Sequence, residues 1–182
     1  MSGFFASLMG LFGLGKSAPK EYKTTGAFPD LRHQVLSLDP ATIGLAATRS
    51  NPVWGVVMET AYPEAVATLV TLGDGTVSLY FSNGGGIIGA GQHEGPRKAG
   101  EALLALAPHF ISHAQPTRVF PLPAEGHTRF YFLCFDGVLT AEAEEEDLGN
   151  NRLPLSPLFH KAHEVITAAR LVDERQRGNR QP

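Results

Sequence analysis

Apolar and polar residues alternate along the segment that leads into the most glycine-rich part of the chain. Residues 77–82 read Val-Ser-Leu-Tyr-Phe-Ser, which has the two-residue period of a strand with one buried face. Asn83 and the glycines after it can adopt the positive φ angles of a tight turn, and Ile87 resumes the apolar run. The pattern predicts a hairpin whose second arm is rich in glycine.

Two strand-like stretches precede this hairpin and two follow it. Residues 53–60 and 65–72 are rich in valine, threonine and leucine, and short turns join them to the hairpin, which predicts an antiparallel meander of about four strands. Residues 130–135 form an unbroken apolar run that predicts a central strand buried on both faces, paired with residues 138–143. In the first strand, simple alternation assigns Val53, Gly55 and Val57 to one face and Trp54, Val56 and Met58 to the other.

Three helices are predicted around these strands. Pro29 opens a short one, and Pro96 opens a second whose apolar stripe runs from Ala99 to Phe110. Ser156-Pro157 begins the last helix. The expected fold is α+β, with a central antiparallel sheet (the meander plus a second hairpin) flanked by helices. This order resembles that of profilin-like and longin-like domains in topology only, and such a likeness does not fix function.

The composition divides the chain into four parts. We expect an apolar N-terminal segment over residues 1–15, a polar linker over 16–26, a single α+β domain over 27–174 and a loose polar C-terminal tail over 175–182. On a helix, the large apolar residues of the first part would share one side. They are Phe4, Phe5, Leu8, Leu11 and Phe12.

Two interpretations of this N-terminal segment stay open. It is too short to span a bilayer, which takes about 20 apolar residues. It can dock on its own domain or on a second subunit, which favours a protein partner or self-association as a homo-oligomer. It can also act as a weak interfacial membrane anchor assisted by Lys16, Lys20 and Lys23.

Charge and cysteine content narrow the classes of partner. The 182 residues carry a net charge of −3 and the pI is about 6.1, so the basic footprint of a nucleic-acid-binding protein is missing and no nucleic acid is expected. Cys134 is the only cysteine, which excludes a disulfide framework and favours a reducing, cytoplasmic setting. Within its apolar strand this thiol is predicted to be a buried hydrophobe rather than a nucleophile.

The glycine-rich arm is the strongest candidate for a binding site. Gly84-x-Gly86-x-x-Gly89 formally matches the dinucleotide fingerprint. The next helix starts only at Pro96, however, and the flanking strands look antiparallel, so the context of that motif is missing. A more general anion site is better supported, because basic residues follow at the predicted helix start, where amide groups favour a phosphate or carboxylate. The candidate ligand-binding residues are Gly84, Gly85, Gly86, Gly89, Gly91, His93, Arg97 and Lys98. The basic side chains can equally be exposed residues paired with Glu94 or Glu101.

Other polar clusters are assigned structural roles. The pairs His109/His113 and His160/His163 have helical spacing, but neither completes a metal-ligand motif, so no metal is expected. The acidic residues of 142–147 are interpreted as a solvated strand end or loop.

Two hypotheses about function follow. The first is a non-enzymatic cytoplasmic module that works through protein contacts. The second is a binder or enzyme for a small anionic ligand that uses the Gly84–Gly91 arm and the start of the next helix. Known catalytic motifs are missing from the sequence, which favours a protein without enzymatic activity; the cofactor, if there is one, is unknown.

Overall fold

The computed structural model describes residues 22–47 and 52–179. The predictions for the N-terminal segment 1–15 and for most of the linker therefore lie outside the described residues. The helices are α1 (Phe28–Leu36), α2 (Glu94–Leu106), α3 (Glu145–Gly149) and α4 (Ser156–Gly178), with 3₁₀ turns η1 (Pro40–Ile43), η2 (Ala90–Gln92) and η3 (Ala107–His113). The strands are β1 (Val53–Ala61), β2 (Val66–Leu72), β3 (Val77–Phe81), β4 (Gly86–Ile87), β5 (Gln115–Thr117), β6 (His127–Cys134) and β7 (Gly137–Glu144).

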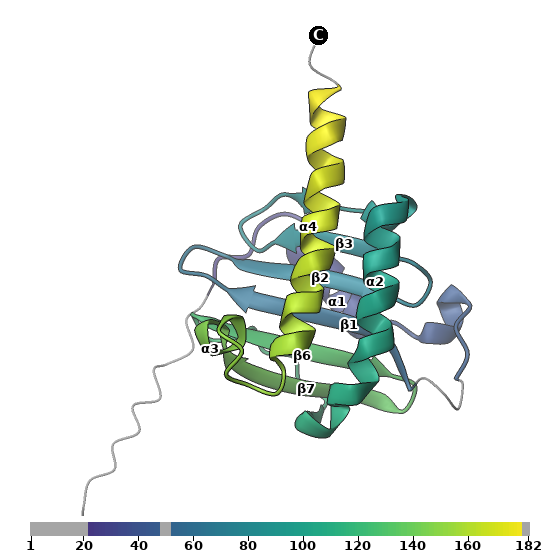
Figure 1. The fold of residues 1–182 in the computed structure, drawn as a ribbon, viewed down its shortest axis with the longest axis vertical. Coiled ribbons are helices and arrows are strands. Elements are labelled where there is room, and N and C mark those ends of the chain that lie inside the picture. The colour runs from purple at the N-terminus through teal and green to yellow at the C-terminus, as the bar shows by residue number, and fades with distance from the viewer. Residues whose placement is uncertain (1–21, 48–51, 180–182) are drawn as a thin grey trace, which may run out of the picture.

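The seven strands of the described residues form one antiparallel sheet in the order β4-β3-β2-β1-β6-β7-β5. The first four form the predicted meander, and β6 with β7 forms the second hairpin, so the α+β prediction with a central antiparallel sheet is confirmed (Figure 1). The finer likeness to profilin-like or longin-like topology is not confirmed.

Helices α2 and α4 lie side by side across one face of the sheet (Figure 1). They bury a large apolar cluster against it, with Phe130 and Phe132 of β6 at its centre. Gly100 lets α2 approach closely, because a Cβ there would lie 2.9 Å from the Thr71 methyl group. Tyr131 and Leu133 of the same β6 strand are buried on the opposite face, which confirms the prediction of a strand covered on both sides.

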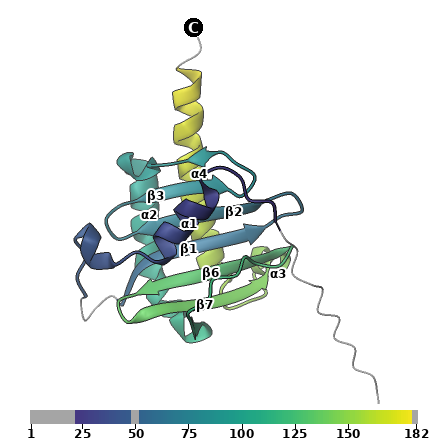
Figure 2. The same cartoon turned by 180° about the vertical axis from the view of Figure 1, so that it is seen from behind.

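The opposite face is covered mainly by the short helix α1, which is much shorter than the sheet is wide (Figure 2). Trp54 packs on this face with Val57, whereas Val53 packs on the α2/α4 face. The face assignment by simple alternation was therefore wrong for Val53 and Trp54. The reason is a shift in the β1–β6 register between Val53 and Gly55, which the alternation rule cannot anticipate.

Two segments are more helical than expected. The acidic run ends β7 and then forms α3, where Glu145, Glu146 and Asp147 occupy the first turn, the position in which a helix dipole favours negative charge. Helix α4 continues to Gly178 and projects beyond the edge of the sheet, so residues 175–178 are helical (Figure 1). No helix in the described part of the chain combines the length and apolar character that crossing a bilayer requires.

Candidate functional site

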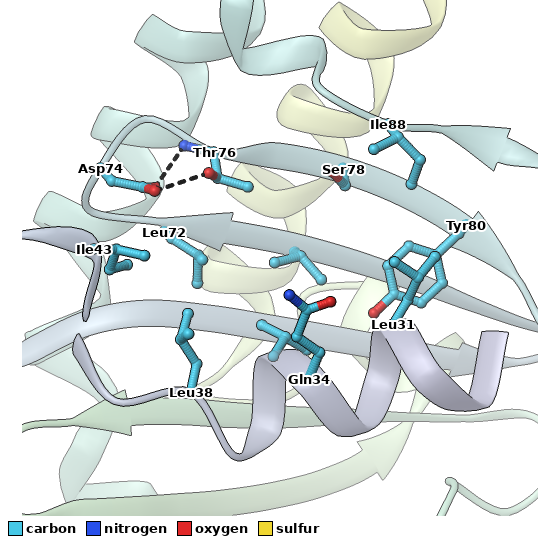
Figure 3. Close-up of a pocket in the computed structure, with 12 residues that line it drawn as sticks. Leu31, Gln34, Leu38, Ile43, Leu72, Asp74, Thr76, Ser78, Tyr80 and Ile88 are labelled. Carbon is cyan, nitrogen blue, oxygen red and sulfur yellow. Dashed lines mark hydrogen bonds between the residues drawn. The ribbon is translucent and has the colours of Figure 1, made fainter. Parts of the chain in front are cut away.

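A cavity of about 300 Å³ lies between α1 and strands β2 and β3. Figure 3 shows Leu38, Ile43 and Leu72 at one end and Leu31, Tyr80 and Ile88 at the other. Gln34, Thr76 and Ser78 add polar groups, and the one charged residue of the lining, Asp74, accepts hydrogen bonds from the backbone amide and hydroxyl of Thr76 at 2.9 and 3.1 Å. Most of the remaining lining is aliphatic.

A second cavity of about 240 Å³ extends this space toward the glycine-rich arm. It shares Leu31, Tyr80 and Ile88 with the first cavity, and none of its lining residues is charged. We call the two together the α1 groove. The remaining lining residues of the second cavity are Thr25, Gly26, Ala27, Phe28, Phe81, Gly84, Gly85 and Gly86. Ile88 is 62% exposed at the rim, so a large apolar side chain borders an already apolar depression.

Tyr80 lines the groove and has a hydroxyl group without a hydrogen-bond partner in the described structure. The residue is 4% exposed. Burial, reinforced by the negative charge of Glu59 and opposed by Arg32, raises the pKa of this phenol well above its usual value. The hydroxyl therefore stays protonated, and it lies out of contact with solvent, on the side of the residue that interacts with Glu59 and Arg32.

A buried ion pair holds α1 on the sheet. Arg32 of α1 donates from Nε to Glu59 Oε1 at 2.7 Å and from Nη2 to Oε2 at 2.9 Å, while the Thr68 hydroxyl donates to Oε1 at 3.1 Å. Glu59 is completely buried. Burial lowers the pKa of Arg32, but hydrogen bonding and charge attraction to Glu59 raise it more, and the net shift is upward. Arg32 therefore stays protonated, and the two hydrogen bonds of the pair fix the position of α1.

The ion pair belongs to a polar row across this face. Glu59 on β1 lies opposite Arg129 on β6, which lies opposite Glu142 on β7, and Arg129 forms an ion pair with Glu142. Together with Arg32 the row has two positive and two negative charges, so these buried and half-buried groups compensate one another. The sequence analysis did not predict this row. The available signal was Glu59, a charged residue that directly follows the apolar residues of β1.

The glycines predicted to bind a ligand have different places in the structure. Gly84 and Gly85 have φ angles of 105° and 81° in the turn after β3, and together with Gly86 they line the α1 groove. Gly89 precedes η2. Gly91 serves the protein's own packing, because a Cβ there would overlap the Gly75 carbonyl oxygen.

The predicted basic residues stand apart from these glycines at the start of α2. A ring nitrogen of His93 lies 2.9 Å from the Gln176 side chain of α4. Lys98 pairs with Glu94 at 2.6 Å, as one of the alternatives anticipated. Arg97 lies beside Gly75. None of the three lines the cavity that Gly84, Gly85 and Gly86 share, so the structure does not bring the eight candidate residues together in one cavity.

The two histidine pairs considered as metal ligands lie in separate parts of the structure. His160 contacts the Asn151 side chain at 3.0 Å, and the His163 ring packs 4.3 Å from that of Phe159. His109 and His113 are on the 3₁₀ turn η3 rather than on an α-helix. Among the described residues, no three His, Cys, Asp or Glu side chains are placed to hold a metal ion.

Cys134 is buried, as predicted. Burial, assisted by the charge of Asp136, raises the pKa of its thiol to about 11. The thiolate, which is the nucleophilic form, is therefore scarce at neutral pH.

No family model, curated protein or solved structure matches this chain. The α1 groove is consequently judged on its own geometry. It is an open, apolar depression with one unsatisfied hydroxyl, held in shape by a buried ion pair.

Proposed function

We propose that this protein is a non-enzymatic module that works through protein contacts, and that the α1 groove is its contact surface. The observation that carries the proposal is the apolar lining of the groove between α1 and strands β2 and β3, bordered by the exposed Ile88. Concave, mostly apolar depressions of this volume are typical of binding sites. A cytoplasmic setting and self-association are parts of the same proposal.

The size and shape of the groove suit an apolar segment of a protein. A cavity of about 150 Å³ accommodates one benzene molecule, so the volume of about 300 Å³ under α1 has room for roughly two aromatic rings. The groove is open along one side of a helix, as in complexes where an amphipathic helix inserts anchor residues into an apolar groove.

The ion pair of Arg32 and Glu59 preorganises this surface for binding. Because it fixes α1 before any partner arrives, little conformational freedom is lost when the groove is filled, and this loss is a main cost of association.

Selection from a random peptide library on the full-length protein tests the proposal. We expect enriched peptides with aromatic or aliphatic residues at helical spacings of three or four. Their binding should fall at least tenfold with Ile88→Asp and remain unchanged with Val119→Asp, which places the same charge at a 70% exposed valine outside the groove. Equal loss in both variants, or enrichment of peptides without an apolar pattern, would count against the groove.

The small anionic ligand remains the second candidate, supported by Arg97 and Lys98 near the start of α2, where backbone amide groups favour negative charge. A thermal-shift screen with phosphates and carboxylates separates it from the first. A ligand at 100 times its Kd adds about 2.7 kcal/mol to the free energy of unfolding. If the anion site is correct, this gain disappears in Arg97→Glu/Lys98→Glu and persists in Ile88→Asp; the protein-contact proposal expects no such gain.

A further inference from the structure

We propose that residues 3–14 of this chain dock intramolecularly in the α1 groove and occupy it in the free protein. This inference rests on the proposed function, because it names the segment that the contact surface holds when no partner is bound. We call residues 3–14 the N-terminal arm.

The arm matches the groove in chemistry. It contains no charged residue, and on a helix Phe4, Leu8, Leu11 and Phe12 share one side. The groove likewise has a single charged lining residue, Asp74, whose carboxylate already accepts two hydrogen bonds from Thr76. Docking therefore buries apolar groups on both sides and leaves no charge without a partner.

The dimensions also agree. Phe4 and Phe12 are eight residues apart, which is about 12 Å along a helix, and the nine residues of α1 span about 13.5 Å. The cavities of about 300 and 240 Å³ lie along this helix and share the residues at their junction. At roughly 150 Å³ for each aromatic ring, they have room for about three large side chains.

The chain enters the described structure next to the groove. Tyr22 packs on Ala61 and Val66, and Thr25 donates its backbone amide to the Ser82 carbonyl at 2.9 Å. The next residues, Gly26 and Ala27, line the groove together with Thr25. Residues 15–21 join the arm to Tyr22, and seven extended residues reach about 23–25 Å, which exceeds the length of α1.

Tethering favours the arm of the same molecule over that of a second copy. A short linker gives an effective concentration of the order of 1 mM. An arm with an intrinsic Kd of about 100 µM would then fill its own groove in about nine molecules out of ten.

The test uses the full-length chain and a fluorescent peptide of residues 2–20. Phe4→Asp/Phe12→Asp should empty the groove, so the peptide should bind this arm variant about tenfold more tightly than the wild type, in which the tethered arm competes. Adding Ile88→Asp to the arm variant should abolish peptide binding. Ser2→Asp/Ser17→Asp places two equal charges outside the arm and should leave the wild-type affinity unchanged.

Three results would overturn the inference. Equal affinity for the wild type and the arm variant would show that the arm does not fill the groove, and so would failure of the peptide to bind either protein. A wild-type dimer that the arm substitutions convert to monomers in sedimentation velocity would place the arm in a second copy instead. If library-selected peptides still require Ile88 in these cases, the proposed function stands while the intramolecular occupant is wrong.

Discussion

At the scale of single residues, the most consequential feature is the charge buried under α1. Glu59 is completely buried, and the Arg32 side chain is 15% exposed. Bringing two charges out of water is costly, and a buried pair recovers that cost only through close, hydrogen-bonded contact. Two hydrogen bonds from the guanidinium and a third from Thr68 provide this contact. Neither charge is expected to be tolerated without the other.

Arg32→Met should lower the free energy of unfolding by about 3–5 kcal/mol, because it leaves Glu59 buried without its counter-charge. The double variant Arg32→Met/Glu59→Leu should be more stable than this single variant. Lys98→Met breaks an ion pair whose side chains are 71% and 70% exposed and should cost less than about 1 kcal/mol. Urea denaturation measures all three, and a double variant as unstable as Arg32→Met would contradict this account.

His163 is expected to contribute a pH dependence to stability. Its Nε2 is buried without a hydrogen-bond partner among the described residues. Burial, reinforced by His160 and opposed by Glu145, lowers the pKa of the folded-state imidazole below the ordinary value of 6.5. The unfolded state then binds the proton more readily, so stability is complete above pH 6.5 and falls as the pH drops from there toward the folded pKa.

His163→Gln removes this titration, and its free energy of unfolding should fall less than that of the wild type between pH 7.5 and 5.5. His109→Gln, at an exposed histidine, should retain the wild-type dependence. Denaturation curves at the two pH values provide the comparison, and identical losses in wild type and His163→Gln would refute the assignment.

At the scale of elements, close backbone packing explains part of the glycine-rich arm. Gly91→Ala should cost about 1–3 kcal/mol, since the new methyl group would overlap the Gly75 carbonyl oxygen and force η2 away from its neighbour. Gly95→Ala is the matched control in α2, where a Cβ meets nothing within 4 Å, and it should gain about 0.4–1 kcal/mol. Thermal or urea unfolding measures the change in the free energy of unfolding for each variant. Equal changes for the two substitutions would argue against the packing role of Gly91.

The elements themselves were largely predictable, because apolar periodicity and turn residues are local signals. The meander, the second hairpin and three helices follow from them. The β1 register shift at Val53 and Trp54 depends on pairing with Leu133 and Cys134 of β6, about 80 residues away in the chain, as expected of a feature set by tertiary contacts. The α1 groove could not be predicted either, since it is built from residues of α1, β2 and β3 that only folding brings together.

At the scale of the whole molecule, the two faces of the sheet are covered unequally. Helices α2 and α4 cover one face, whereas the short α1 covers only part of the other (Figures 1 and 2). The α1 groove lies on that second face. If the arm fills that groove, the choice between its two interpretations becomes a competition between the groove and a membrane surface. The lysines that follow the arm, Lys16 and Lys20, would add attraction to anionic lipid of about 1 kcal/mol each.

This competition predicts how full-length variants bind vesicles of phosphatidylcholine and phosphatidylserine. Ile88→Asp should expel the arm and raise the vesicle-bound fraction up to about tenfold in co-sedimentation, because about nine wild-type arms in ten would otherwise be docked. The gain should vanish when Phe4→Asp/Phe12→Asp is added and should weaken in high salt, which screens the lysines. Val119→Asp should behave as wild type. Equal sedimentation of wild type and Ile88→Asp would mean that the groove does not restrain the arm, since releasing a restrained apolar segment must increase its availability to lipid.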